Sequence, residues 1–312
     1  MGIDAAVANA FRRILIAEIP TLAIEDVFVF NNTSIIQDEV FAHRLGLVPL
    51  KGNKDGLNWL RWFKKGNKDE NEPGSVPSDH NTVVLSLNVE CKWQEGGQQR
   101  ARAGETDPQR LYENSSVYAK QIVFDPVGQQ ETLFPAPDGL VAPVNPDVLL
   151  AKLRPGQKIS CSMHCIKGIG ADHAKFSPVA TASYRLLPHI QILRPIVGAD
   201  ARKFARCFPK GVITLQPITA EEAARPGSGY ETHEGEVRAV VSEPMRDTVS
   251  RECLRHEEFR DKVKLGRVRD HFIFRVESTG QFDSDELFLE SVKLLKIKCQ
   301  KMKRGLAGLM TV

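Results

Sequence analysis

The composition describes an ordinary globular protein and excludes several classes. The chain has 312 residues, 42% of them hydrophobic and 26% charged, which is enough to bury a sizeable core and to fold as two or more units. Its net charge of +3 is small for an autonomous nucleic-acid-binding protein. No apolar run approaches the roughly 20 residues that cross a bilayer, and no signal peptide is visible. We therefore expect an intracellular protein whose six cysteines are reduced thiols.

The chain opens with a helix signal. Asp4 is placed to cap a helix that Pro20 ends. Apolar residues recur at helical spacing between them, at Val7, Phe11, Ile14 and Leu15. Arg12 and Arg13 interrupt this stripe and are expected to point away from it.

A second helix is predicted over Gln37–Leu45, where Phe41 and Leu45 are apolar and a glycine follows the last residue. The segment Lys51–Thr82 is rich in charge, glycine and proline. It is typical of a long surface loop around a short amphipathic piece, Leu57–Phe63.

Alternating apolar residues predict strands in the middle of the chain, most clearly at Val83–Cys91. Further strands are expected at Val117–Phe124, Lys158–Cys165, Val179–Leu187, Val212–Leu215 and Phe272–Glu277. Helical segments are expected at Pro146–Leu153, Ala199–Cys207 and Thr248–Lys264. Loops are expected at Gln94–Gln109 and Ala224–Glu236, and one long helix from about Asp283. The fold class is therefore α+β.

The last helix carries an apolar stripe with a heptad period. Residues spaced 4, 3, 4, 3 and 4 apart form it: Phe288, Val292, Leu295, Cys299, Met302 and Leu306. Such a stripe covers either the core of its own chain or a helix of a partner. Six basic residues and no acidic ones lie between Lys293 and Arg304. A solvated face and an acidic partner both account for them, whereas the lack of interleaved aromatic residues disfavours single-stranded nucleic acid.

The sequence contains no recognisable catalytic or metal-binding motif. Cys161 and Cys165 share a face of a predicted strand, but four residues at ~3.3 Å each separate them by about 13 Å, too far for a disulfide or a shared zinc ion. Buried, inert thiols are the better interpretation. His164, Asp172 and His173 match no known ligand spacing, and a stand-alone enzyme based on them is the rival hypothesis. We expect no catalytic residue, no metal and no cofactor.

Several long blocks resemble one family. They are NAFRRILIAEIPTLAIE and QDEVFAHRLGLVPL near the start, DHAKFSPVATASYRLLP in the middle, and RDHFIFRVESTGQFDSDELFLESVKLL near the end. These blocks are similar to the alpha-like subunits of multisubunit RNA polymerases, and most of all to the larger alpha-like subunit shared by eukaryotic RNA polymerases I and III. The RNA polymerase II and archaeal equivalents are the runner-up. The cysteines with which those relatives bind zinc or an iron–sulfur cluster are missing here.

The resemblance implies a domain organisation. Residues 1–50 and 268–312 would form a discontinuous dimerisation domain that combines helices with a sheet. Residues 51–190 would be an inserted, mainly β domain, and 191–267 a small degenerate ferredoxin-like insert in which only Cys207 remains of a cluster-binding turn. The family places a strand before the first helix, so we expect the first sheet to lack a strand.

The resemblance also implies function: a non-catalytic assembly platform that pairs with a smaller alpha-like subunit and docks the large catalytic subunits. The residues expected at the heterodimer interface are Phe11, Leu15, Phe41, Leu45, Phe288, Val292, Leu295, Cys299 and Met302. Arg12 and Arg13 would reach the second-largest, beta-like subunit, with simple exposure to solvent as the alternative. Other implied partners are small zinc-binding polymerase subunits, and DNA and RNA only indirectly through the holoenzyme. No membrane is involved, and the expected location is the nucleus, including the nucleolus.

Overall fold

The computed structural model describes residues 1–64, 74–137 and 139–310, and these fold as two compact units. Unit 1 comprises Met1–Asn9 and Ser183–Arg275, and unit 2 comprises Ala10–Ala182 and Val276–Val312. Both helices and strands are abundant, which confirms the predicted α+β class. Part of the predicted loop Lys51–Thr82, at residues 65–73, lies outside the described residues.

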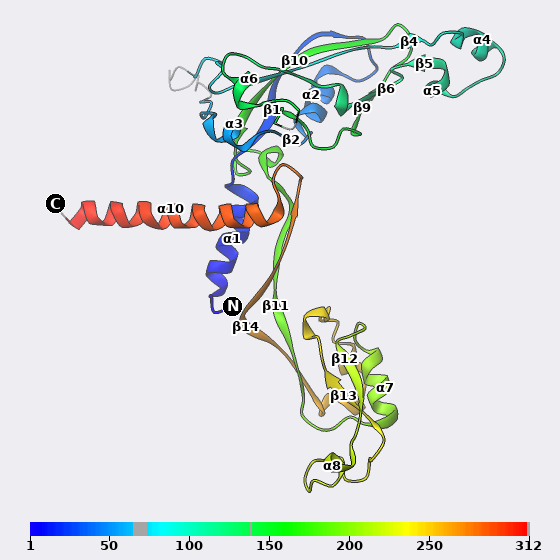
Figure 1. The fold of residues 1–312 in the computed structure, drawn as a ribbon, viewed down its shortest axis with the longest axis vertical. Helices are drawn as coiled ribbons and strands as arrows, with labels where there is room; N and C mark the ends of the chain where they lie inside the picture. The colour runs from blue at the N-terminus through cyan, green and yellow to red at the C-terminus, as the bar shows by residue number, and fades with distance from the viewer. Residues whose placement is uncertain (65–73, 138, 311–312) are drawn as a thin grey trace. The chain divides into compact units, whose positions relative to one another are not determined.

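Unit 2 is built on a four-stranded antiparallel sheet in the order β1-β10-β3-β7 (Figure 1). Its strands are β1 (Thr21–Asn32), β10 (Lys158–Gly168), β3 (Val83–Glu90) and β7 (Val123–Asp125). The predicted strands at Val83–Cys91 and Lys158–Cys165 are confirmed as β3 and β10, in a register that sets Leu85 opposite Met163. Alternate residues of both strands are buried, so one face of the sheet carries the core.

Helix α2 (Asp38–Gly46) lies close to β1 and contributes Phe41 and Leu45 to the core beside the sheet. The predicted helix at Pro146–Leu153 is wrong, because this segment contains the strand β9 (Leu149–Lys152), which pairs with β6 (Ser116–Tyr118). Pairing with β6 buries Leu150 and Ala151, and such a tertiary contact outweighs local helix propensity.

The other elements between β1 and β11 in unit 2 are short. They are β2 (Leu50–Lys51), α3 (Lys54–Trp59), β4 (Lys92–Trp93), α4 (Gly97–Arg102), α5 (Pro108–Leu111), β5 (Tyr112–Glu113), α6 (Gln130–Leu133), β8 (Ala142–Pro143) and two 3₁₀ turns at Ala119–Gln121 and Ala174–Phe176. The region predicted as a loop at Gln94–Gln109 thus contains α4 and the first two residues of α5.

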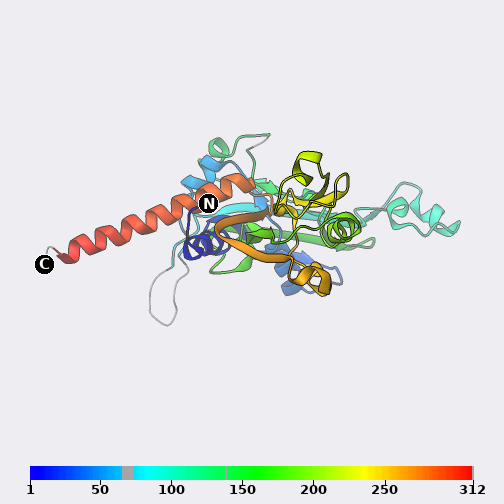
Figure 2. The ribbon, with the colours of Figure 1, turned by 90° about the horizontal axis from the view of Figure 1, so that it is seen from below.

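Two longer helices also contribute to unit 2, which contains all of α10 and the part of α1 from Ala10 onward. Helix α1 (Ala5–Ala17) follows the predicted cap residue Asp4, but the Asp4 carboxylate accepts its hydrogen bond from the adjacent Ala5 N–H at 2.8 Å and not from the second or third N–H of the helix, where a capping side chain usually binds. Helix α10 (Ser284–Met310) packs its first turns near the C-terminal half of α1 and then continues as a single rod, drawn in red in Figures 1 and 2.

Unit 1 contains a hairpin of β12 (Ile213–Pro217) and β13 (Val237–Val241) beside α7 (Gly198–Arg206). The rings of Phe208 and Phe259 meet Phe204 in its core at centroid distances of 5.0 and 5.2 Å. The smaller elements are α8 (Ala220–Ala223), α9 (Glu257–Arg260) and 3₁₀ turns at Pro244–Arg246 and Glu252–Arg255. Strand β13 was not predicted. The predicted helix at Thr248–Lys264 is largely wrong, since it holds only a 3₁₀ turn and α9 before a strand begins.

Strands β11 (Val179–Ile192) and β14 (Val263–Ser278) pair in a two-stranded ribbon and carry the chain between the units. Strand β11 was predicted to end before Pro188, but it continues to Ile192. Every strand of a two-stranded ribbon is an edge strand, and an edge can place a proline where no ladder hydrogen bond is needed.

Candidate protein-interaction site

The surface of α10 changes from buried to exposed along its length. At its base, Leu287 is 1% exposed and Ser291 is fully buried. Phe288, Leu294 and Leu295 are half-buried against a small core that also contains Ile14 and Leu15 of α1. The base of the helix is therefore fixed by its own chain.

The distal part of α10 presents apolar side chains to solvent. Ile297 is 45% exposed, Leu306 60% and Met302 70%. Met302 and Leu306 belong to the heptad stripe, whereas Ile297 lies about 180° around the helix from Leu306. Neighbouring exposed apolar side chains such as Met302 and Leu306 are typical of a surface that a partner covers. Two residues nearer the base are also exposed, Val292 at 40% and Leu289 at 59%.

The residues predicted at the heterodimer interface fall into three groups by exposure. Val292, Cys299 and Met302 are exposed. Phe11, Phe288 and Leu295 are half-buried, and the rings of Phe11 and Phe288 meet at a centroid distance of 5.7 Å.

The third group corrects the sequence-based interpretation. Leu15, Phe41 and Leu45 have no exposed surface in the chain itself. Leu15 belongs to the core shared by α1 and α10, and Phe41 and Leu45 belong to the core beside the sheet. Helix periodicity identifies an apolar face but does not say which partner covers it. Leu15, Phe41 and Leu45 are therefore core residues, and they are not part of the exposed apolar stripe.

Charged side chains accompany the apolar stripe. Lys298 pairs with Glu18, the residue that follows α1, at 2.5 Å, and Lys293 pairs with Glu290 within α10 at 2.5 Å. Both pairs are substantially exposed, so each adds little to stability, about 0–1 kcal/mol. The basic residues between Lys293 and Arg304 are all exposed, as expected for a solvated face.

The two arginines of α1 differ in exposure. Arg13 is exposed, whereas Arg12 is half-buried and makes contacts within the chain. Both belong to unit 2, and the helix face that carries Ile14 and Leu15 is the buried one.

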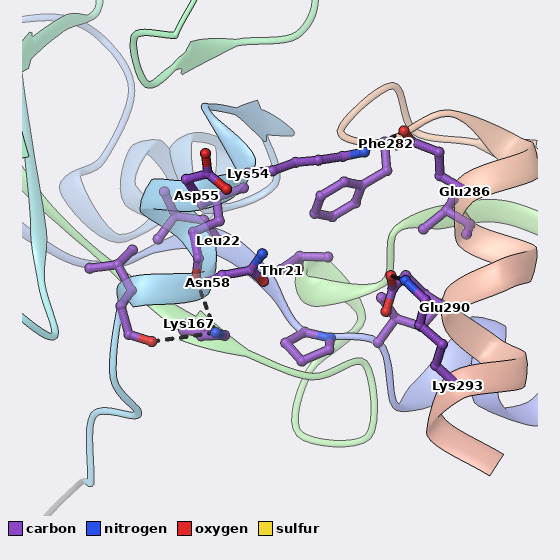
Figure 3. Close-up of a pocket in the computed structure, with 15 residues that line it drawn as sticks. Thr21, Leu22, Lys54, Asp55, Asn58, Lys167, Phe282, Glu286, Glu290 and Lys293 are labelled. Atoms are coloured by element: carbon purple, nitrogen blue, oxygen red, sulfur yellow. Dashed lines mark hydrogen bonds and ion pairs between the residues drawn. The ribbon is translucent and has the colours of Figure 1, made fainter. Parts of the chain in front are cut away.

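A pocket of about 320 Å³ lies between α3, the start of β1 and the base of α10 (Figure 3). Lys54 of α3 and Glu286 of α10 form an ion pair at its edge. On the other side, the Lys167 ammonium donates hydrogen bonds to the carbonyl oxygens of Leu57 at 3.0 Å and Leu60 at 3.3 Å. Burial lowers the pKa of Lys167 below the usual lysine value.

Sequence reasoning did not predict this pocket. Its lining comes from segments around residues 20, 57, 167 and 287, and no local pattern connects them. The lysine and glutamate residues involved look like ordinary surface charges when each segment is considered alone.

The two histidines of the rival enzyme hypothesis have structural roles. The ring of His164 packs edge-on against Phe28 at a centroid distance of 4.7 Å. His173 accepts a hydrogen bond at Nδ1 from the Lys175 N–H at 3.1 Å and so caps a 3₁₀ turn. Asp172 is exposed.

The cysteines of the described residues are free, and all except Cys299 are buried. Burial raises the pKa of Cys161 to about 11 and that of Cys165 still further, which keeps both thiols protonated and unreactive at neutral pH. Among the residues that the structure describes, no group of three or more His, Cys, Asp or Glu side chains is arranged to hold a metal ion. Within the described residues, no helix is both long enough and apolar enough to span a membrane.

Comparison with known proteins identifies the class to which this geometry belongs. Residues 1–299 match the model of the RNA polymerase Rpb3/Rpb11 dimerisation domain, and the chain belongs to this family.

Individual relatives narrow the assignment. The chain is 53% identical over 304 residues to the RPAC1 subunit of DNA-directed RNA polymerases I and III from Saccharomyces cerevisiae, covering 97% of this chain and 82% of that protein. It is 46% identical over 301 residues to the human RPAC1 subunit, covering 96% and 78%. The RNA polymerase II subunit rpb3 of Dictyostelium discoideum is 28% identical over 312 residues, covering 97% and 88%. The prediction of a non-catalytic alpha-like subunit, of the type shared by RNA polymerases I and III, is confirmed.

Family membership has two direct implications. A dimerisation domain of this type implies pairing with an Rpb11-like subunit within the polymerase. A subunit of RNA polymerases I and III implies location in the nucleus.

Proposed function

We propose that this chain is the assembly platform of RNA polymerases I and III, and that it pairs with the smaller alpha-like subunit through the exposed stripe of α10. The observation that carries the proposal is the contrast within α10: its base is buried against α1, whereas Met302 and Leu306 project into solvent. A helix that is already fixed at one end has less conformational entropy to lose when a partner covers the other end, which favours pairing.

The same proposal assigns a docking role to α1. Arg13 is exposed and Arg12 is half-buried, and a guanidinium group can donate two hydrogen bonds to one carboxylate. We assign these arginines to contact with the second-largest, beta-like subunit. Small zinc-binding subunits complete the set of proposed neighbours, DNA and RNA are reached only through the holoenzyme, and the nucleolus is the proposed site of the polymerase I copy.

The proposed dimerisation domain comprises residues 1–50 and 268–312, with 51–190 and 191–267 as inserts. Replacing residues 193–262 with a short linker would join β11 directly to β14, its paired neighbour. We expect the shortened chain to retain pairing, because the exposed stripe of α10 belongs to unit 2. Loss of pairing in a shortened chain that is still folded by circular dichroism would argue against this organisation.

Purification of the tagged chain from nuclei tests the proposal as a whole. We expect the smaller alpha-like subunit and the large subunits of both polymerases I and III to co-purify in stoichiometric amounts, and the fluorescently tagged chain to be concentrated in nucleoli. Expressed without the partner, the chain should aggregate, because its exposed apolar stripe is left uncovered. A soluble monomer that co-purifies with no polymerase subunit would overturn the proposal.

Elemental analysis of the purified heterodimer complements this experiment. After the metal content of the partner is subtracted, we expect no stoichiometric zinc or iron in this chain. One zinc per copy that is lost when Cys161 or Cys165 is mutated would contradict the interpretation of these buried thiols as inert.

A further inference from the structure

The pocket between α3, β1 and α10 is lined by both apolar and charged side chains, the latter including Asp55, and it contains one half-buried cation, Lys167. Leu22, Leu57, Phe282 and Leu287 supply apolar side chains, and Lys167 extends into the site from β10 (Figure 3). A lining of this kind holds an apolar group and fixes its orientation through a small number of polar contacts.

The charges around the pocket are not equivalent. Lys54 is paired with Glu286, and Lys293 is paired with Glu290. Lys167 instead uses two of its donors on backbone carbonyl oxygens, and within the described part of the chain no carboxylate pairs with it.

A protonated amine has three donors, so Lys167 retains one for an acceptor in the pocket. The cost of burying its charge is reflected in its lowered pKa, and an anion bound beside it would offset that cost. An acceptor that carries negative charge therefore fits this position better than a neutral one.

We propose that the pocket binds a carboxylate carried on an apolar segment of another polypeptide of the polymerase, with Lys167 as its anchor. This inference rests on the proposed assembly function. Both a chain terminus and an acidic side chain next to an apolar residue supply this chemistry.

Two observations favour a polypeptide over a free metabolite. The first turns of α10, the proposed pairing helix, form one wall of the pocket, so a partner that follows α10 toward its base reaches the opening. The volume of about 320 Å³ is at the lower end of the range for small-molecule sites and suits an apolar side chain with an adjacent carboxylate.

Site-specific photo-crosslinking within the purified polymerase tests the proposal. The photoreactive residue p-benzoylphenylalanine replaces Asn58, an exposed residue of α3 that lines the pocket, and the crosslinked peptide is sequenced by mass spectrometry. We expect a crosslink to another subunit, in a segment that carries a carboxylate beside an apolar residue. The same probe at Glu39, an exposed residue that does not line the pocket, should not yield this peptide.

Charge variants in the crosslinking chain test the anchor. Lys167→Gln keeps hydrogen-bond donors but removes the charge, and it should lower the crosslink yield about tenfold or more. Lys167→Arg keeps the charge and should retain most of the yield. Lys54→Gln removes a cation from the exposed pair at the edge and should change the yield by less than about twofold. If the Lys167→Gln chain no longer enters the polymerase, tagged wild-type and variant chains are made to compete for assembly. The fraction of each variant in the purified polymerase should then follow the same order as the expected crosslink yields.

The outcomes separate this inference from the assembly function. Crosslinks only within the chain itself, crosslinks to a segment without a carboxylate, or an unchanged yield from Lys167→Gln overturn the inference while leaving assembly intact. If phosphate stabilises the wild-type heterodimer but not Lys167→Gln, and no crosslink forms from Asn58, the pocket is a site for a small anion and the inference fails. Failure of the wild-type chain to enter the polymerase overturns the proposed function instead.

Discussion

Replacement of Met302 by aspartate is the most direct test of the α10 surface. Met302 is 70% exposed in the chain, so the substitution removes almost no internal packing and should leave the fold unchanged. If the smaller alpha-like subunit covers this position, pairing buries the methionine and stabilises the complex by about 1–2 kcal/mol, given ~1.5–3 kcal/mol for full burial of such a side chain.

The aspartate adds a second cost because its carboxylate must lose water at an apolar contact. With neighbouring lysines that can partly compensate, we take this cost as at least about 1–2 kcal/mol. The sum of about 2–4 kcal/mol corresponds to a decrease in affinity of roughly 30-fold to 1,000-fold, at 1.4 kcal/mol per factor of ten. Met302→Ala loses only the first term and should weaken pairing by roughly 5-fold to 30-fold.

Gln300 provides the matched control. It is exposed and lies two residues from Met302, about 200° around the helix, so it occupies the opposite face. Gln300→Asp changes the net charge by the same amount and should be nearly neutral for pairing.

Competition measures these differences without requiring a soluble lone chain. Wild-type and variant chains with different tags are co-expressed with a limiting amount of the smaller subunit, and their ratio in the purified heterodimer gives the relative affinity. Equal capture of the wild type and Met302→Asp, or equal losses for Met302→Asp and Gln300→Asp, would refute the assignment of this helix face.

Three further predictions concern other parts of the chain. Arg12→Ala combined with Arg13→Ala should leave the alpha-like heterodimer intact but weaken its binding to the second-largest subunit by about 2–5 kcal/mol. Normal recruitment of that subunit in a pull-down would show that the two arginines are simply exposed to solvent. Lys175→Met should lower the free energy of unfolding by about 3–5 kcal/mol in denaturant titrations of the heterodimer. The reason is that Lys175 and Glu25 form an ion pair at 2.5 Å and their side chains are only 12% and 14% exposed. A small effect would show that Glu25 finds another partner. In the purified heterodimer, a thiol reagent at pH 8 should label the five buried cysteines of this chain only after denaturation, since burial raises the pKa of Cys161 and Cys253 to about 11. Rapid native labelling of several of these five thiols would contradict the described core.

The sequence predicted most reliably those elements whose pattern is set locally. Strand β3 alternates strictly because one face covers the core and the other does not, and this period is visible without any knowledge of its neighbours. Strand β1 was missed. Its first residues, Thr21–Ile24, are buried in succession, and a short continuous apolar run between two helices has no distinguishing period.

In the candidate site, too, local features could be predicted from the sequence, whereas features that depend on distant segments could not. The heptad spacing of α10 identified side chains that the structure leaves exposed, such as Met302, because spacing along one helix is a local property. Burial of Phe41 and Leu45 depends on the sheet against which α2 packs, and the pocket around Lys167 depends on segments more than 100 residues apart. Neither could be obtained from periodicity.

The charge on α10 constrains which partner can cover its apolar stripe. The exposed positions between Lys293 and Arg304 carry six basic residues and no acidic ones. Two copies of this helix placed side by side would bring like charges close together, and their repulsion opposes self-association. This repulsion becomes weaker as the salt concentration rises, because salt screens the charges. A different helix with apolar residues at the matching positions and acidic residues beside them meets no such repulsion. If α10 pairs as proposed, the apolar stripe would supply affinity, and the basic residues around it would favour a heteromeric partner over a second copy of this chain.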